Sequence, residues 1–310
     1  MIRPPFLLFV AMAACASSAG PAEQPPETPR FDGARAFAHL EKIVAIGPRP
    51  AGSEGAARTR GYVTVQLKAL GLTVQEQAFD ADTPIGPIRM VNLRATIPGG
   101  GGGAGGRRLI VAGHYDTKRF EAFTFVGAND GGSSTAFLIE LARVLKDAGH
   151  AMPIELVFFD GEEAVRLDWE GTDNTYGSRR YVADARRDGT LADIHAMILV
   201  DMIGDRDLRI MRDTNSTPWL ADIFWSAARR LGHRQFVDDA MAIEDDHVPF
   251  LQAGVPAVDI IDLDYPAWHT EADTIDKVSA ESMQLVGDVL VAGLPEVIGR
   301  RSRQGGSRRP

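Results

Sequence analysis

The sequence predicts an α/β protein, a three-layer α/β/α sandwich around a central mixed, mostly parallel sheet. One observation is a set of short apolar runs without polar alternation, which is typical of strands buried on both faces. A second is that segments of helical periodicity separate these runs, as in βαβ units. The runs are Leu109–Ala112, Ile154–Phe159, Ala196–Val200 and Val255–Ile261.

The first third of the chain predicts two helices followed by two strands. Apolar residues recur at helical spacing from residue 31 to residue 44. The segment GPRPAGS interrupts this pattern, and a second amphipathic helix then continues through Leu70, where Gly71 ends it. Alternation and β-branched residues indicate strands at Leu72–Phe79 and Arg89–Ile97. The glycine-rich stretch Gly99–Gly106 reads as a flexible connector.

The remaining helices lie between and after the four apolar runs. Phe137 to Ala148 carries the buried stripe of a helix after the first run. Helical segments also follow the second and third runs, and a long apolar one closes the chain. We expect these three at Gly177–Arg187, Trp219–Leu231 and Ala280–Ile298.

The N-terminal residues 1–20 resemble an export signal. Arg3 precedes an apolar segment that is too short to anchor a helix in a membrane, and small residues follow it. The only cysteine, Cys15, follows a Met-Ala-Ala sequence similar to a bacterial lipoprotein cleavage site. Lipidation of Cys15 and its removal with the signal are both open. We expect an exported protein, periplasmic or secreted, with membrane attachment only through lipid on Cys15.

The rest of the chain divides into a linker, one domain and a tail. Residues 21–32 are rich in proline and read as a linker, residues 33–299 as a single domain, and residues 300–310 as a basic, disordered tail. The tail has five arginines and no acid, although the whole chain has a net charge of −9. The body is therefore acidic, which argues against binding nucleic acid. A single cysteine excludes an internal disulfide.

Polar residues follow each of the four apolar runs. Because the carboxyl ends of parallel strands meet at one edge of a sheet, where ligands bind, these residues should converge. His114 and Asp130 come after the first run, one directly and one before the next helix. The later runs are followed by Glu162 and Glu163, by Asp201, and by Trp268 and His269.

Adjacent carboxylates in LVFFDGEEA point to hydrolase-type chemistry. Neighbouring loop residues face different directions, so Glu163 can bind a metal while Glu162 acts as a general base. Carboxylates and imidazole without thiolate are the ligands of a catalytic zinc site. We therefore expect Asp130, Glu163 and His269 to hold a zinc ion, so the domain at 33–299 should be catalytic.

Each of these residues has a simpler structural explanation. Asp130 could cap the helix that starts near residue 133. His114 could be a hydrogen-bonded core histidine, Asp201 a residue bonded to amides at a strand end, and His269 part of a loop. Their position after successive strands favours a shared site over four separate coincidences.

The motifs resemble a known family. They are GHYDTK, GANDGGSSTAFLIELAR, LVFFDGEEA, YGSRRY, LVDMIGD, EDDHVPFLQAGVPAVDII and WHTEADT, spread from about Phe37 to about Leu294. They are similar to the zinc aminopeptidase superfamily, with its phosphorylase/hydrolase-like fold, and within it to bacterial-type glutaminyl-peptide cyclotransferases. The resemblance implies cyclisation of N-terminal glutamine on peptides or proteins to pyroglutamate, with release of ammonia. It also implies one zinc on Asp130, Glu163 and His269.

The same resemblance implies roles for further residues. Glu162 would act with Asp201 and Asp245, and the last two carboxylates would share a proton instead of binding a second metal. Trp268, which precedes the metal histidine, would line the substrate pocket. So would Trp169, although its loop is one residue longer than in the family, and Tyr265, which stands near where phenylalanine is usual. Glu244 is a departure too, because a glutamine is expected there.

Three alternatives accompany this interpretation. In a two-zinc aminopeptidase that removes N-terminal residues, His114 and Asp201 would hold the second ion and Glu162 would activate a water molecule. Tryptophans 169 and 268 could also simply pack the core. A non-enzymatic receptor on the same fold is less favoured, because such proteins usually lose the base or a ligand. We expect a monomer.

Overall fold

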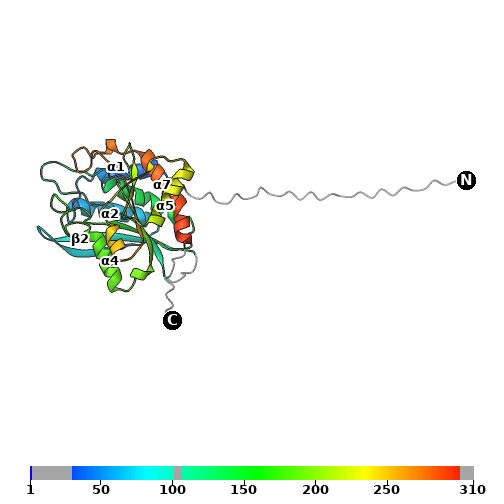
Figure 1. Ribbon diagram of the computed structural model, residues 1–310, viewed down its shortest axis with the longest axis horizontal. Coiled ribbons are helices and arrows are strands. Elements are labelled where there is room, and N and C mark those ends of the chain that lie inside the picture. Colours follow the sequence, from blue (N-terminus) through cyan, green and yellow to red (C-terminus); the bar gives the residue numbers. More distant parts are fainter. Residues whose placement is uncertain (2–29, 101–105, 301–310) are drawn as a thin grey trace.

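The computed structural model describes residue 1, residues 30–100 and residues 106–300. A six-stranded sheet lies between two layers of helices (Figure 1), with the strand order β1-β2-β4-β3-β5-β8. Its strands are β1 (Val74–Thr83), β2 (Gly86–Ile97), β3 (Arg108–His114), β4 (Ile154–Phe159), β5 (Ile194–Asp201) and β8 (Ala257–Ile261).

The sheet is mixed and mostly parallel, as predicted. Strands β4, β3, β5 and β8 run parallel, while β1 pairs with β2, and β2 with β4, in antiparallel fashion. His114 at the end of β3 pairs with Phe159 at the end of β4, and Asp201 ends β5 opposite Ile261. The carboxyl ends of the parallel strands therefore share one edge, and the predicted three-layer α/β class is confirmed.

The parallel strands bury alternating side chains in two separate cores. On β3, Leu109 and Val111 join the larger core, whereas Ile110 and Ala112 face the smaller one. This alternation follows from the two-residue repeat of a strand, and apolar residues at every position satisfy both faces.

Helices cover both faces of the sheet. The larger core lies under α1 (Gly33–Val44), α2 (Glu54–Ala69), α3 (Gly132–Lys146), α5 (Pro218–Leu231) and α7 (Ala280–Gly299). The smaller core lies under the two remaining helices, α4 (Tyr176–Arg187) and α6 (Val248–Gln252).

Local sequence sets several helix ends. The side chain of Asp32 accepts hydrogen bonds from two backbone N–H groups of the first turn of α1, and Ser53 caps α2 in the same manner. Helix α5 starts with Pro218 and ends at Leu231, and Gly232, with a φ of +79°, caps its C-terminus. The long apolar α7 packs against α1 and α5, as expected for a core helix.

Several short elements were not predicted. Strands β6 (Ile210–Asp213) and β7 (Phe236–Met241) form a separate two-stranded parallel sheet. Helix α6 and the 3-10 turns η1 (Leu191–Asp193) and η2 (Ile275–Lys277) are also additional. The predicted export signal with Cys15, nearly all of the linker and of the basic tail, and residues 101–105 of the glycine-rich connector lie outside the described residues.

Candidate metal centre and active site

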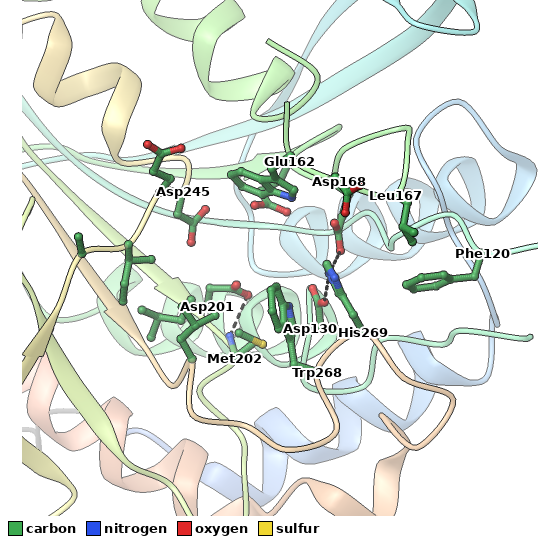
Figure 2. A pocket seen from close by; sticks show the side chains of 17 residues that line it. Phe120, Asp130, Glu162, Leu167, Asp168, Asp201, Met202, Asp245, Trp268 and His269 are labelled. Atoms are coloured by element: carbon green, nitrogen blue, oxygen red, sulfur yellow. Dashed lines mark hydrogen bonds and ion pairs between the residues drawn. The ribbon is translucent and has the colours of Figure 1, made fainter. Parts of the chain in front are cut away.

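The predicted site residues meet around one cavity at the carboxyl edge of the parallel strands. It has a volume of about 470 Å³, and Figure 2 shows its lining side chains pointing inward. Eight of the predicted residues line it: Asp130, Glu162, Glu163, Trp169, Asp201, Asp245, Trp268 and His269. As far as the described residues show, His114 and Tyr265 do not.

Asp130, Glu163 and His269 form a cluster that fits a divalent cation. Nε2 of His269 lies 3.1 Å from Oε1 of Glu163 and 3.4 Å from Oδ2 of Asp130. One ligand atom from each residue falls within 4.8 Å of the others. Oδ2 of Asp130 is buried and has no hydrogen-bond partner in the described part of the chain. A buried, unpartnered carboxylate oxygen beside an imidazole nitrogen suits zinc, which takes oxygen and nitrogen ligands.

The turn after β4 presents the two adjacent glutamates. Gly161 has a φ of +69°, a left-handed conformation that bends the chain directly after the strand. The Asp116 carboxylate then accepts hydrogen bonds from the backbone N–H groups of Glu162, at 3.2 Å, and Glu163, at 3.4 Å. The local fold thus directs two neighbouring carboxylates to different places around the cavity.

The loop before α3 holds Asp130. The Asp273 carboxylate accepts hydrogen bonds from the backbone N–H groups of Asn129 and Asp130, at 2.8 and 3.1 Å. The N-cap of α3 is Gly131, with φ +69° and no side-chain capping bond. Asp130 is therefore not a helix cap, and its side chain faces the cavity.

Unusual backbone conformations occur beside the site. Among the described residues, three that are not glycine have positive φ: His269 at 53°, Met202 at 45° and Thr175 at 44°. Met202 directly follows Asp201, and the Thr175 backbone N–H donates to the carbonyl of Glu162. Such conformations cost free energy and persist where surrounding contacts determine them, often at functional sites.

A second cluster shares Asp130 with the first. Nε2 of His114 lies 3.2 Å from Oδ1 of Asp201 and 3.3 Å from Oδ1 of Asp130, and these three residues could also hold a cation. Burial lowers the pKa of His114, but the charges of Asp201 and Glu162 and hydrogen bonds to Asp116 and Asp130 outweigh it and raise the pKa well above its ordinary value. His114 therefore lies among carboxylates that either a bound cation or hydrogen bonds to the imidazole could satisfy.

The pKa values of Glu162 and Asp245 are both raised. Burial raises the pKa of Glu162 well above its ordinary value; His114 opposes this, and the nearby carboxylates reinforce it. The pKa of Asp245 is also raised well above its ordinary value, first by burial and then by the charge of Asp201. A carboxyl group whose pKa is raised can both accept and return a proton near neutral pH.

Asp201 and Asp245 line the same cavity, and the charge of Asp201 acts on the Asp245 carboxyl group. Oδ2 of Asp245 is buried and has no hydrogen-bond partner in the described chain, so a proton shared with Asp201 stays a prediction. Asp201 uses Oδ1 for His114 and for the backbone N–H of Met202. Asp213 instead supports the Asp245 segment, since it accepts a hydrogen bond from the Ile243 N–H and lies 3.0 Å from the buried His247 ring.

The three aromatic residues expected to line the pocket differ in their burial and contacts. Trp268 is 42% exposed and stacks on His269, with ring centroids 4.3 Å apart, so it does not pack the core. Trp169 is partly buried at the cavity wall. The expectation for Tyr265 as a pocket residue is wrong. Its side chain is buried and its hydroxyl donates to Asp273 at 2.8 Å, so it supports the Asp130 loop from behind.

Residues without a predicted role also shape the site. Lys118 is buried beside Glu163, and Arg49 is buried with its guanidinium donating to backbone carbonyls around the Asp130 loop. The motifs GHYDTK and GPRPAGS contain them, but a basic residue in a motif gives no sign that it will be buried. Phe120 and Leu167 extend the cavity wall beyond His269 (Figure 2).

Comparison with known proteins identifies similar chains. The model of peptidase family M28 matches residues 92–294. The glutaminyl-peptide cyclotransferase of Drosophila melanogaster is 30% identical over 80% of this chain and 77% of its own length. A glutaminyl cyclase from an Acidobacteriales bacterium is 39% identical, with a TM-score of 0.83 over 92% of this chain and 100% of its own. A leucine aminopeptidase precursor from Bacteroides thetaiotaomicron shares the fold at 23% identity, with a TM-score of 0.78 over 89% of this chain and 99% of its own.

Proposed function

The chain belongs to peptidase family M28 and, within it, to the glutaminyl-peptide cyclotransferases, and from this premise we propose that it closes N-terminal glutamine of peptides or proteins to pyroglutamate. The observation that carries the proposal is the cluster of Asp130, Glu163 and His269. Glu162 is not part of this cluster but lines the same cavity beside it. In this reaction the α-amine attacks the side-chain amide carbon. One C–N bond forms, the bond to the amide nitrogen breaks, and ammonia leaves.

Asp130, Glu163 and His269 would hold one zinc ion. When bound, zinc supplies Lewis-acid polarisation of the amide carbonyl of the glutamine side chain. Asp130 and Glu163 bring two negative charges to this position, and the strained backbone at His269 fixes the direction of its imidazole. These residues are therefore arranged before the substrate arrives.

Glu162 would move the proton. It takes one proton from the α-amine as the new C–N bond forms and returns it to the departing nitrogen, which leaves as ammonia. The raised pKa of Glu162 suits both halves of this transfer, because a strongly acidic carboxyl group would be a poor base for the amine. The transfer needs no water molecule.

Asp201 and Asp245 would hold the amine end of the substrate. Both line the cavity, and Figure 2 shows them on the side of Glu162 away from Phe120 and Leu167. Trp268 and Trp169 would pack against the methylene groups of glutamine. Holding the chain folded on itself brings the amine and amide together and favours ring closure over hydrolysis.

We further propose that one ion, held by Asp130, Glu163 and His269, is sufficient. In the alternative aminopeptidase, His114 and Asp201 hold a second ion. The 39% identity to a glutaminyl cyclase favours cyclisation, whereas the aminopeptidase relative at 23% identity supports only the fold. Export of the chain, attachment through lipid on Cys15 and a monomeric state remain proposals based on the sequence.

A paired assay tests this function. Purified protein is given a peptide that begins with Gln and one that begins with Leu, and ammonia, pyroglutamyl peptide and free amino acid are measured. We expect ring closure only, with a loss of about 10²–10⁴-fold in Glu162→Gln because the proton-transfer group is removed. The matched control is Glu170→Gln, an exposed glutamate in the following loop, which should retain activity. Release of leucine without ring closure would contradict the proposal and support the aminopeptidase.

A further inference from the structure

Lys118 is a buried cation that the proposed mechanism does not use. Its side chain is 0% exposed, and Nζ lies 3.7 Å from Oε2 of Glu163. Nζ also donates a hydrogen bond of 3.0 Å to the carbonyl of Ala164, one residue further along the same turn. Burying an ammonium group is costly unless it is paired, so this position requires its partners.

The two oxygens of Glu163 have different surroundings. Oε1 faces Nε2 of His269 at 3.1 Å, whereas Oε2 makes no hydrogen bond in the described chain and forms an ion pair with Nζ of Lys118 at 3.7 Å. Asp130 is divided in the same way, with Oδ2 near His269 at 3.4 Å and Oδ1 near His114 at 3.3 Å. Each carboxylate therefore presents one oxygen to the metal position and turns the other toward a buried basic group.

This division affects how many ligand positions the chain fills. A carboxylate can bind a metal through one oxygen or through both. A catalytic zinc site needs three protein ligand atoms and an open position for substrate. If both oxygens of Glu163 were available, that side chain could take the fourth position itself.

We propose that Lys118 is a positioning residue that restricts Glu163 to one ligand oxygen and so keeps a coordination position open for the substrate. The inference rests on the proposed function, because it assumes the metal cluster of Asp130, Glu163 and His269. Arg49, the other buried cation near this loop, donates to the carbonyls of Tyr115 and Gly127 and makes no ion pair with Glu163 in the described chain. Lys118 therefore acts on the Glu163 side chain itself.

Substitution of Lys118 tests the inference through the metal spectrum. Zinc content and zinc affinity are measured first, and the protein is then loaded with Co²⁺, whose visible absorption weakens as its coordination number rises above four. In Lys118→Met the freed Oε2 should reach the metal. We expect one ion per chain bound at least as tightly as in the unaltered protein, a clear loss of Co²⁺ absorption, and a fall in kcat of about 10–100-fold. Lys118→Arg, which keeps the charge, should restore most of the Co²⁺ absorption.

Arg108→Met is the matched control. It removes another largely buried cation, whose side chain is 15% exposed and pairs with Glu155 on β4. Arg108 starts β3, at the end of the strand opposite to the site. It should lower thermal stability but leave the Co²⁺ spectrum unchanged. The contrary results for Lys118→Met are a loss of thermal stability alone, as in Arg108→Met, or weaker zinc binding with an unchanged Co²⁺ spectrum. Either result would show that Lys118 has only a structural role and would overturn the inference.

The outcomes separate this inference from the function on which it rests. An unaltered protein that binds one ion and closes Gln peptides, but whose spectrum does not respond to Lys118→Met, would overturn the positioning role alone. An unaltered protein that binds neither zinc nor Co²⁺ would overturn the metal cluster and the positioning role together.

Discussion

Nε2 of His269 lies 3.1 Å from Oε1 of Glu163, although 106 residues separate them in the chain. The contact joins the turn after β4 to the loop after β8. His269 has a φ of 53° where it makes this contact. Two acids and one imidazole are brought so close that a cation between them would relieve the repulsion between Asp130 and Glu163.

Removal of the metal should therefore change stability as well as activity. Treatment with a zinc chelator is expected to abolish ring closure and to lower Tm. An ion present at about 1,000 times its Kd stabilises the folded state by about 4 kcal/mol. Differential scanning calorimetry and metal analysis during zinc addition should show recovery at about one ion per chain. His269→Ala is the control, and its Tm should not respond to zinc. Full activity after the chelator has removed all zinc would contradict the metal proposal.

Trp268→Ala should weaken substrate binding without unfolding the protein. The ring is 42% exposed and stacks on His269, so its removal leaves no core cavity and should change stability by about 0.5 kcal/mol or less. Loss of an aromatic wall against the glutamine stem should raise KM about tenfold. Steady-state kinetics on Gln peptides would measure this.

Trp219→Ala is the matched control, since this partly buried tryptophan on α5 lies outside the cavity and packs under Arg300. Its KM should match that of the unaltered protein. An unchanged KM in Trp268→Ala would show that this residue does not contact the substrate.

Tyr265→Phe tests the corrected role of that residue. The substitution removes only the hydroxyl that donates to Asp273, which in turn holds the Asn129 and Asp130 N–H groups. Loss of this buried hydrogen bond should cost about 1–3 kcal/mol of stability. Because the hydroxyl lies behind the loop, we expect weaker zinc binding with KM nearly unchanged. A large rise in KM with normal zinc affinity would instead return Tyr265 to the substrate pocket.

Asp262 should make stability depend on pH. It is buried directly after β8, and burial raises its pKa from 3.8 to about 7. Between pH 4 and pH 7 the folded chain keeps a proton that the unfolded chain has lost, so the free energy of unfolding falls as pH rises through this window. Asp262→Asn keeps an acceptor for the Arg209 N–H and removes the titration.

From pH 5 to pH 8 the free energy of unfolding should therefore fall by about 2 kcal/mol more in the unaltered protein than in Asp262→Asn. Urea unfolding at pH 5 and at pH 8 measures this difference. Asp160 and Asp246, whose pKa values are also raised to about 7, titrate in both proteins and cancel in the comparison. Equal losses in the two proteins would show that Asp262 does not titrate in this window.

The central strands and long helices were predictable because their burial leaves a repeat in the chain. Runs such as Ala196–Val200 are apolar at every position, which is typical of a strand covered on both faces. Strand β7 was missed because Val237 to Ala240 is partly buried or exposed and includes two aspartates, so it leaves no such repeat. Helix α6 has five residues, too few to show helical periodicity.

The sequence alone determined the parallel strands of the main sheet, the edge at which ligands gather and the polar residues that directly follow those strands. These follow from hydrophobic periodicity and from the rule that parallel strands end together. Only the tertiary structure decided which atoms of those residues meet. The division of the Glu163 oxygens between His269 and Lys118 and the role of Tyr265 behind Asp273 depend on side-chain directions. Those directions are set by positive φ values and by packing between distant segments. Neither of these can be recognised in the amino-acid sequence.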